Sequence, residues 1–158
     1  MKYIIKQKIF SLGTSFYIKN ELEEDVYSIK GEVFSLGKKL RLYDLEDREL
    51  VYIEQQLFNF LPVYNIYVNG EVIAKVKKKF TLFRTEFSIE SKGKEYILEG
   101  DFLAHEYKIL SQGLVVANIS KEWFTFSDTY GVDISEGESH PFILAMVIVL
   151  DQACHEGR

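Results

Sequence analysis

Short segments in which apolar and polar residues alternate recur along most of the chain. In one of them Phe87 and Ile89 flank Ser88, and neighbouring segments repeat this period of two. Such alternation is typical of β-strands that bury one face. Polar pairs separate the segments, and one of them, Asn69-Gly70, is typical of the tight turn in a β-hairpin. The pattern therefore predicts many short strands joined by hairpins.

A recurring phenylalanine organises these segments into a longer repeat. Its positions are separated by 24, 24, 22, 22 and 22 residues: Phe10, Phe34, Phe58, Phe80, Phe102 and Phe124. Each phenylalanine ends one predicted strand, and a second strand with alternating apolar residues follows it. Six such units contain twelve strands at regular spacing, which favours a sandwich or a barrel.

The C-terminal segment decides between these two architectures. Every residue from Phe142 to Leu150 is apolar, and Pro141 suits the first turn of a helix. A helix that is apolar on all sides must be buried on all sides, and a barrel of about a dozen strands has room for one. We therefore expect a mainly β fold: a closed twelve-stranded antiparallel barrel from six two-strand repeats, enclosing one hydrophobic helix at about 140–155. The alternative is two barrels that pair through an exposed helix.

Composition fits a single folded domain over residues 1–158. Hydrophobic residues make up 47% and aromatic residues 15%, which favours a sheet with a sizeable core. The net charge of −5 opposes a general nucleic-acid role. The longest apolar run is nine residues against about 20 needed to cross a bilayer, and the N-terminus has no apolar stretch of signal-peptide length. A monomer in the cytoplasm is the expectation.

Several short motifs resemble the LURP-one-related family of the tubby C-terminal-like superfamily. They are Phe10-Ser11-Leu12-Gly13, Tyr52-Ile53-Glu54-Gln55, Gly100-Asp101-Phe102, Ile119-Ser120-Lys121-Glu122-Trp123, Asp128-Thr129-Tyr130 and Ile148-Val149-Leu150-Asp151-Gln152. The likeness runs from about Lys2 to Gln152. It implies a twelve-stranded barrel with a central hydrophobic helix, in a bacterial-type member of unknown function. Tubby-like relatives bind phosphoinositide headgroups, phospholipid scramblases are grouped with the same fold, and plant members are linked to defence.

A basic run is the most conspicuous polar feature of the sequence. Its candidate ligands for an anionic phospholipid headgroup are Lys75, Lys77, Lys79 and Arg84. An alternative interpretation is structural. Val72, Ala74 and Val76 are expected to point inward, which turns the lysines to water. The next strand would then pair with them across the sheet through Glu86, Ser88 and Glu90.

The other candidates for chemistry have structural interpretations. His140 and His155 lie at opposite ends of the predicted helix, about 20 Å apart, and together with His105 they are expected at the surface. Cys154, the only cysteine, is expected in the core, because neighbouring helix residues such as Cys154 and His155 point about 100° apart. Asp101, Asp128 and Asp133 could bind calcium, although turn and strand-end roles are favoured.

Two aromatic clusters could form an exposed patch or belong to the barrel core, and the core is the expectation. They are Trp123 with Phe124 and Phe126, and Phe58 with Phe60 and Leu61. No phosphate loop, hydrolase elbow or zinc-ligand spacing is present, so neither an enzyme nor a cofactor is predicted. The sequence favours a non-enzymatic binding or scaffold protein that contacts anionic phospholipid. The alternatives are a protein-interaction module without lipid affinity and, more remotely, an enzyme acting at a barrel rim.

Overall fold

A computed structural model describes residues 1–6, 15–32, 36–123 and 128–155 of the chain. These residues form twelve strands and one helix: β1 (Lys2–Lys6), β2 (Ser15–Asn20), β3 (Asp25–Gly31), β4 (Lys39–Tyr43), β5 (Glu49–Gln55), β6 (Val63–Val68), β7 (Glu71–Lys79), β8 (Glu86–Ser91), β9 (Ile97–Asp101), β10 (Glu106–Ser111), β11 (Leu114–Ser120), β12 (Thr129–Ile134) and α1 (His140–His155). The mainly β class and the position of the helix are confirmed.

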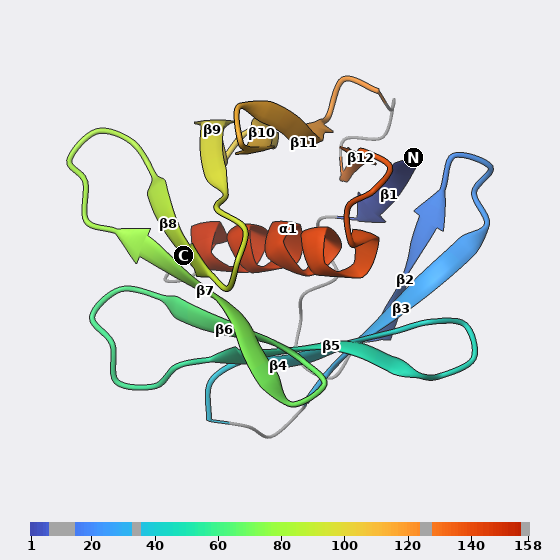
Figure 1. Cartoon of the computed structure of the whole chain (residues 1–158), viewed down its shortest axis with the longest axis horizontal. Helices are drawn as coiled ribbons and strands as arrows, with labels where there is room; N and C mark the ends of the chain where they lie inside the picture. Colours follow the sequence, from blue (N-terminus) through green and yellow to red (C-terminus); the bar gives the residue numbers. More distant parts are fainter. Residues whose placement is uncertain (7–14, 33–35, 124–127, 156–158) are drawn as a thin grey trace.

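All twelve strands belong to one antiparallel sheet that curls into a nearly closed barrel (Figure 1). The order is β8-β7-β6-β5-β4-β3-β2-β1-β12-β11-β10-β9, so neighbours in sequence pair, and β1 pairs with β12. The prediction of a closed barrel is wrong, because β8 and β9 lie at the two ends of this order. Side chains meet there in place of a backbone ladder. The Phe87 and Phe102 rings pack edge to face, with centroids 5.3 Å apart.

The helix supplies the centre of the core. Its side chains from Phe142 to Leu150 are buried, as is Cys154. Figure 1 shows α1 running through the middle of the curled sheet, and it contacts β5, β6, β7 and β12. The inward residues of the strands pack against it, among them Ile18, Ile53 and Ile66. Within the described residues no helix is both long and apolar enough to cross a membrane.

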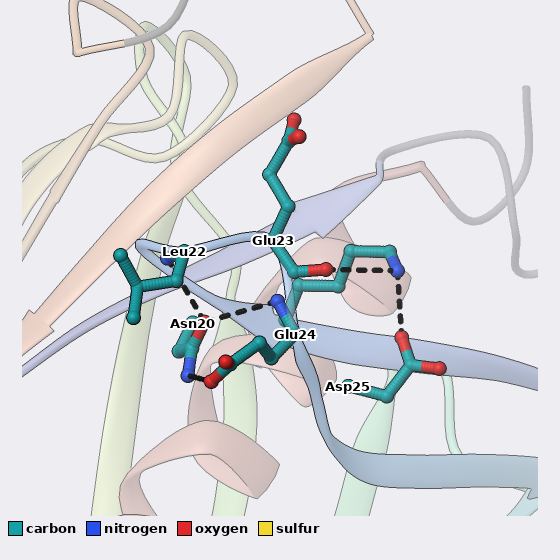
Figure 2. Close-up of polar contacts among 6 residues, drawn as sticks. Asn20, Leu22, Glu23, Glu24 and Asp25 are labelled. Atoms are coloured by element: carbon teal, nitrogen blue, oxygen red, sulfur yellow. Dashed lines mark hydrogen bonds and ion pairs between the residues drawn. The ribbon is translucent and has the colours of Figure 1, made fainter.

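The turn between β2 and β3 is held by one side chain (Figure 2). Asn20 Oδ1 accepts hydrogen bonds from the backbone N–H of Leu22 at 2.9 Å and of Glu24 at 3.0 Å. Glu23 takes a left-handed conformation at φ 63°, which closes the turn. Lys19 then ties the turn to β3 through Asp25, 2.7 Å from its Nζ. Backbone donors that the strands leave unpaired are therefore satisfied locally.

The turn between β4 and β5 repeats this arrangement 24 residues later. Asp44 Oδ1 accepts from the N–H of Glu46 at 2.9 Å and of Arg48 at 3.0 Å. Asp47 matches Glu23, with φ 61°. Both turns follow a shift in strand register, between Ile18 and Lys19 in the first case and between Leu42 and Tyr43 in the second.

A third register shift corrects the expected orientation of β7. Ala74 and Val76 are buried as predicted, whereas Val72 is 38% exposed. The shift lies between Ile66 and Tyr67 on β6, where Tyr67 pairs with Val72 and Ile66 with Ala74. The extra residue, Ile73, breaks the alternation, because a bulge reverses the faces of the residues before it.

Antiparallel order sends successive connections to opposite ends of the barrel. We call one end the turn rim; it carries the turns at 20–24, 44–48, 69–70, 92–96 and 112–113. We call the other end the loop rim, and its described connections include 56–62, 80–85 and 102–105. The C-terminal end of α1 belongs to the loop rim, because Lys78 Nζ lies 3.4 Å from the carbonyl oxygen of Ala153.

Candidate functional site

The loop between β5 and β6 displays two aromatic side chains to solvent. Phe58 is 103% exposed and Phe60 is 92% exposed. Phe58 has φ 62°, a backbone conformation that is unusual for a bulky residue and is found where surrounding structure imposes it. Asn59 Nδ2 donates to the carbonyls of Gln56 and Leu57, and the N–H of Gln56 donates to Val63 at 2.8 Å. The loop is thus held in a shape that keeps both rings out of the core.

The loop between β7 and β8 continues the apolar surface. Phe83 is 97% exposed, and Phe80 and Leu82 are largely exposed as well. The Thr81 hydroxyl bonds to the carbonyl of Arg84 within this loop. The two loops are neighbours, because the cavities beside them, of about 420 and 340 Å³, share Leu61 and Lys78 as lining residues. We call the five most exposed apolar side chains of both loops the apolar patch: Phe58, Phe60, Phe80, Leu82 and Phe83.

This patch corrects one expectation from the sequence, which placed Phe58 and Phe60 in the barrel core. Both follow the end of β5 and precede β6, so they fall in the connection and not on the inner face of a strand. The other aromatic cluster differs. Trp123 is half-buried beneath Lys2, whose Nζ lies 4.9 Å from the ring centroid, whereas Phe124 and Phe126 lie outside the described residues.

Basic side chains border the patch. Lys79 and Arg84 line the same cavity as Phe80 and Phe83, and both are exposed. Arg84 Nε also lies 2.9 Å from Glu86 Oε1, an exposed pair that competition from water weakens. Two of the four predicted headgroup ligands therefore lie beside the exposed aromatics.

The other two predicted ligands lie along the outer face of β7. Lys77 Nζ is 2.9 Å from Glu90 Oε1, and Lys75 is the residue directly opposite Glu90 in the register. The hydrogen bond from Lys77, with a further contribution from the charge of Lys75, lowers the pKa of Glu90 below its ordinary value. The cross-strand pairing expected for this face is confirmed for Glu90. The structure thus divides the four residues between the sheet face and the loop rim.

The histidines show where the sequence interpretation is wrong. His105 is buried, not at the surface, with Nε2 2.8 Å from Asp151 Oδ1 on α1 and its ring stacked on Tyr130 at 4.3 Å. Burial raises the pKa of Tyr130 well above its ordinary value. His140 lies at the other end of α1, where Nδ1 is 2.6 Å from the Tyr3 hydroxyl. The side chain of His155 lies outside the described residues.

The cysteine and the three aspartates that the sequence offered as candidates for chemistry take part in packing, turns and terminal contacts. Cys154 is buried, as expected. Asp101 accepts from the N–H of Ala104 in the turn after β9, and Asp133 lies 3.4 Å from the N-terminal amine. Asp128 accepts a hydrogen bond from the Thr129 hydroxyl. The described residues contain no group of three or more His, Cys, Asp or Glu side chains arranged to hold a metal ion.

The geometry defines a class of protein: a nearly closed twelve-stranded antiparallel barrel with one C-terminal helix and an apolar, locally basic rim. The chain belongs to the LURP-one-related family, whose model matches residues 1–151. The uncharacterized protein YxjI of Bacillus subtilis (strain 168) is 32% identical over 155 residues, which cover 98% of this chain and 94% of that protein. The resemblance to the LURP-one-related family, stated from the sequence motifs, is therefore confirmed.

A solved structure shares the fold. An X-ray structure of a protein from Arabidopsis thaliana matches with a TM-score of 0.69 over 96% of this chain and 89% of that one, at 17% identity. At this identity the likeness concerns the fold alone.

Proposed function

We propose that this protein is a non-enzymatic binding protein whose loop rim docks on the surface of an anionic phospholipid membrane. The apolar patch enters the interface between headgroups and acyl chains, while Lys79 and Arg84 contact headgroup phosphates. The observation that carries the proposal is the exposure of Phe58, Phe60 and Phe83 on two neighbouring, internally bonded loops.

Energetics favour a partner for this surface. Soluble monomers seldom expose a contiguous apolar patch without using it. Each large side chain gains roughly 1.5–3 kcal/mol on full transfer out of water, and partial insertion gains part of this. Each cation near an anionic leaflet contributes about 1 kcal/mol more. The four rings of the apolar patch and two cations on one rim therefore give a reversible affinity for the membrane surface.

The proposal narrows the ligand set expected from the sequence. Lys75 and Lys77 lie beside Glu90 on the sheet face, so they contribute little to headgroup binding. Lys79 and Arg84 remain the proposed ligands. The headgroup binding of tubby-like relatives supports this assignment by analogy of fold.

The expected location, oligomeric state and repeat architecture are part of the same proposal. We place the protein in the cytoplasm, where the facing leaflet is anionic, and expect it to act as a single-domain monomer without a cofactor. We also propose that six two-strand repeats enclose α1. The matched turns at Asn20 and Asp44, 24 residues apart, support the repeat, and the burial of α1 supports its position inside.

Vesicle flotation tests the function. The wild-type chain should float with vesicles of phosphatidylserine and phosphatidylcholine but not with phosphatidylcholine alone, and high salt should weaken the binding. The double variant Phe58→Ser, Phe60→Ser should lose most binding. The matched control is Leu22→Ser, Leu45→Ser, which removes two exposed apolar side chains from the turn rim and should float like wild type.

Charge reversal separates the two groups of basic residues. Lys79→Glu with Arg84→Glu should abolish flotation, whereas Lys75→Glu should leave it nearly unchanged. Equal flotation of all variants, or none by the wild type on any vesicle, would reject the membrane proposal. A second candidate, a protein-interaction module without lipid affinity, is favoured by the unpaired edges of β8 and β9.

A further inference from the structure

The barrel has one open seam, formed by the facing edges of β8 and β9. Among the described strands these two alone pair on one side only, with β7 and β10 respectively. Figure 1 shows them diverging from the turn that connects them. An unpaired strand edge presents a row of backbone donors and acceptors on which another chain can form a ladder.

The backbone groups of β8 that face the seam can be assigned. The N–H of Lys92 donates to the carbonyl of Ile73 at 2.9 Å, in register with the β7–β8 ladder. Hydrogen-bonded and non-hydrogen-bonded pairs alternate along an antiparallel ladder. The N–H and C=O groups of Phe87 and Ile89 therefore point away from β7 and into the seam.

The seam is hollow and has an apolar floor. A cavity of about 510 Å³ lies between the two strands and is lined by residues of both. Phe87 and Phe102 are buried beside it, with their rings in contact across the seam, and the Tyr96 ring lies 5.7 Å from that of Phe142 of α1. An inserted strand would thus find apolar contacts beneath alternate side chains.

Carboxylates line the outer side of the seam along β8 and β9, whereas Lys79 and Arg84 line its loop-rim end. Glu86 and Glu90 alternate with the inward residues of β8, and Glu99 lies on the outward face of β9, opposite Lys108 of β10. Glu86 and Glu90 have ion-pair partners in Arg84 and Lys77. Glu99 is exposed and has no hydrogen bond or ion pair with the described residues.

We propose that the seam accepts an extended segment of a partner protein as an added strand, in which apolar residues alternate with basic ones. The segment runs antiparallel to β8, its apolar side chains face Phe87 and Phe102, and a basic side chain lies over Glu99. A second copy of this chain is a poor occupant, because two seams would bring acidic outer faces together. The proposal does not require membrane binding, although Lys79 and Arg84 line the seam cavity as well as the cavity beside the apolar patch.

A synthetic probe tests this site in the absence of lipid. The probe is a fluorescein-labelled nine-residue peptide in which lysine and valine alternate, and its binding to the full chain is followed by anisotropy. Saturating peptide should slow amide hydrogen exchange at Phe87 and Ile89 at least tenfold. The same peptide N-methylated at its valines should not bind, because residues paired with Phe87 and Ile89 share the inward face.

Charge variants complete the test. Glu99→Lys should weaken peptide binding roughly fivefold, as expected for loss and reversal of exposed charge pairs. Glu21→Lys changes the net charge equally on the exposed turn after β2 and should leave the affinity unchanged. Each of three results would overturn the proposal: equal effects of the two variants, equal binding of the N-methylated peptide, or protection of Phe87 and Ile89 by concentration-dependent dimerisation. Absence of binding by the parent peptide would also overturn it.

Discussion

The two rims of this barrel are built on the same strands and present opposite surfaces. On the turn rim, residues 20–25 carry four carboxylates in six positions, and Asn20 closes the turn with its own side chain. On the loop rim, residues 56–62 carry no charge and residues 80–85 carry only Arg84. Exposed leucines occur on both rims, whereas the exposed phenylalanines among the described residues lie on the loop rim.

The difference teaches that the connections, and not the sheet, decide which end can meet an apolar or anionic partner. Asx side chains satisfy short turns locally and keep the chain polar. The longer loops are closed at their base by backbone bonds such as Gln56 to Val63. Their apolar side chains have no route back to a core that α1 already fills. An anionic membrane would repel the acidic rim and attract the other.

The largest expected loss of stability follows deletion of α1, the helix to which both rims attach. Tyr3 anchors the turn rim to His140, and His105 anchors the loop rim to Asp151. A chain ending at Glu138 loses the helix and should lose cooperative folding. Each large buried side chain is worth roughly 1.5–3 kcal/mol, against a total stability of about 5–15 kcal/mol. Circular dichroism during heating measures this. A soluble truncation that melts cooperatively would refute the role of α1.

A smaller loss of stability is expected when a buried polar pair on the loop rim is broken than when the helix is removed, and a still smaller loss when an exposed pair on the turn rim is broken. Asp151→Ala leaves His105 buried without its carboxylate partner and should lower the free energy of unfolding by about 3 kcal/mol. Asp133→Ala removes an exposed pair with the N-terminal amine and should cost less than about 1 kcal/mol. Urea denaturation gives both values. Equal losses would show that burial of the His105 pair adds nothing.

The turn rim should respond to loss of its side-chain acceptors. Asn20→Ala leaves the N–H groups of Leu22 and Glu24 without their acceptor and should lower stability by about 1 kcal/mol. Glu21→Ala, in the same turn, is the control and should change little. Flotation with anionic vesicles should be the same for both variants, because neither touches the loop rim.

The smallest effect is a pH dependence at Asp44. Hydrogen bonds from the Arg48 backbone hold the pKa of this carboxyl below its ordinary value in the folded chain. Its contribution to stability is therefore complete above the unfolded pKa of about 3.9 and is lost as the pH falls through the folded value. The stability difference between wild type and Asp44→Asn should shrink below about pH 4. A difference that is constant from pH 7 to pH 3 would contradict the assignment.

Local pattern was sufficient to predict strands and helix. Alternation located β6 and β8, and the run from Phe142 to Leu150 located α1. The pattern of apolar and polar residues did not predict features that depend on contacts between residues far apart in the sequence. β8 and β9 do not pair, and their neighbourhood is joined by the ring contact of Phe87 with Phe102, neither of which the period of the sequence reveals.

The candidate site was predictable only in part. Lys79 and Arg84 stood out as charges, but exposed Phe58 belongs to the same aromatic repeat as buried Phe102. Whether such a ring is buried depends on whether it falls on a strand or in a connection, a matter of one or two residues. His105 could not be placed, because its partner Asp151 is 46 residues away in sequence.

The central claim is that the loop rim, and not the turn rim, enters an anionic membrane. A single tryptophan, placed at Phe60 or at Leu45 in a Trp123→Phe background, can be quenched by lipids brominated on their acyl chains. We predict strong quenching at position 60 with anionic vesicles and none at position 45. Equal quenching at both positions, or none at position 60 while the protein is bound, would contradict the account.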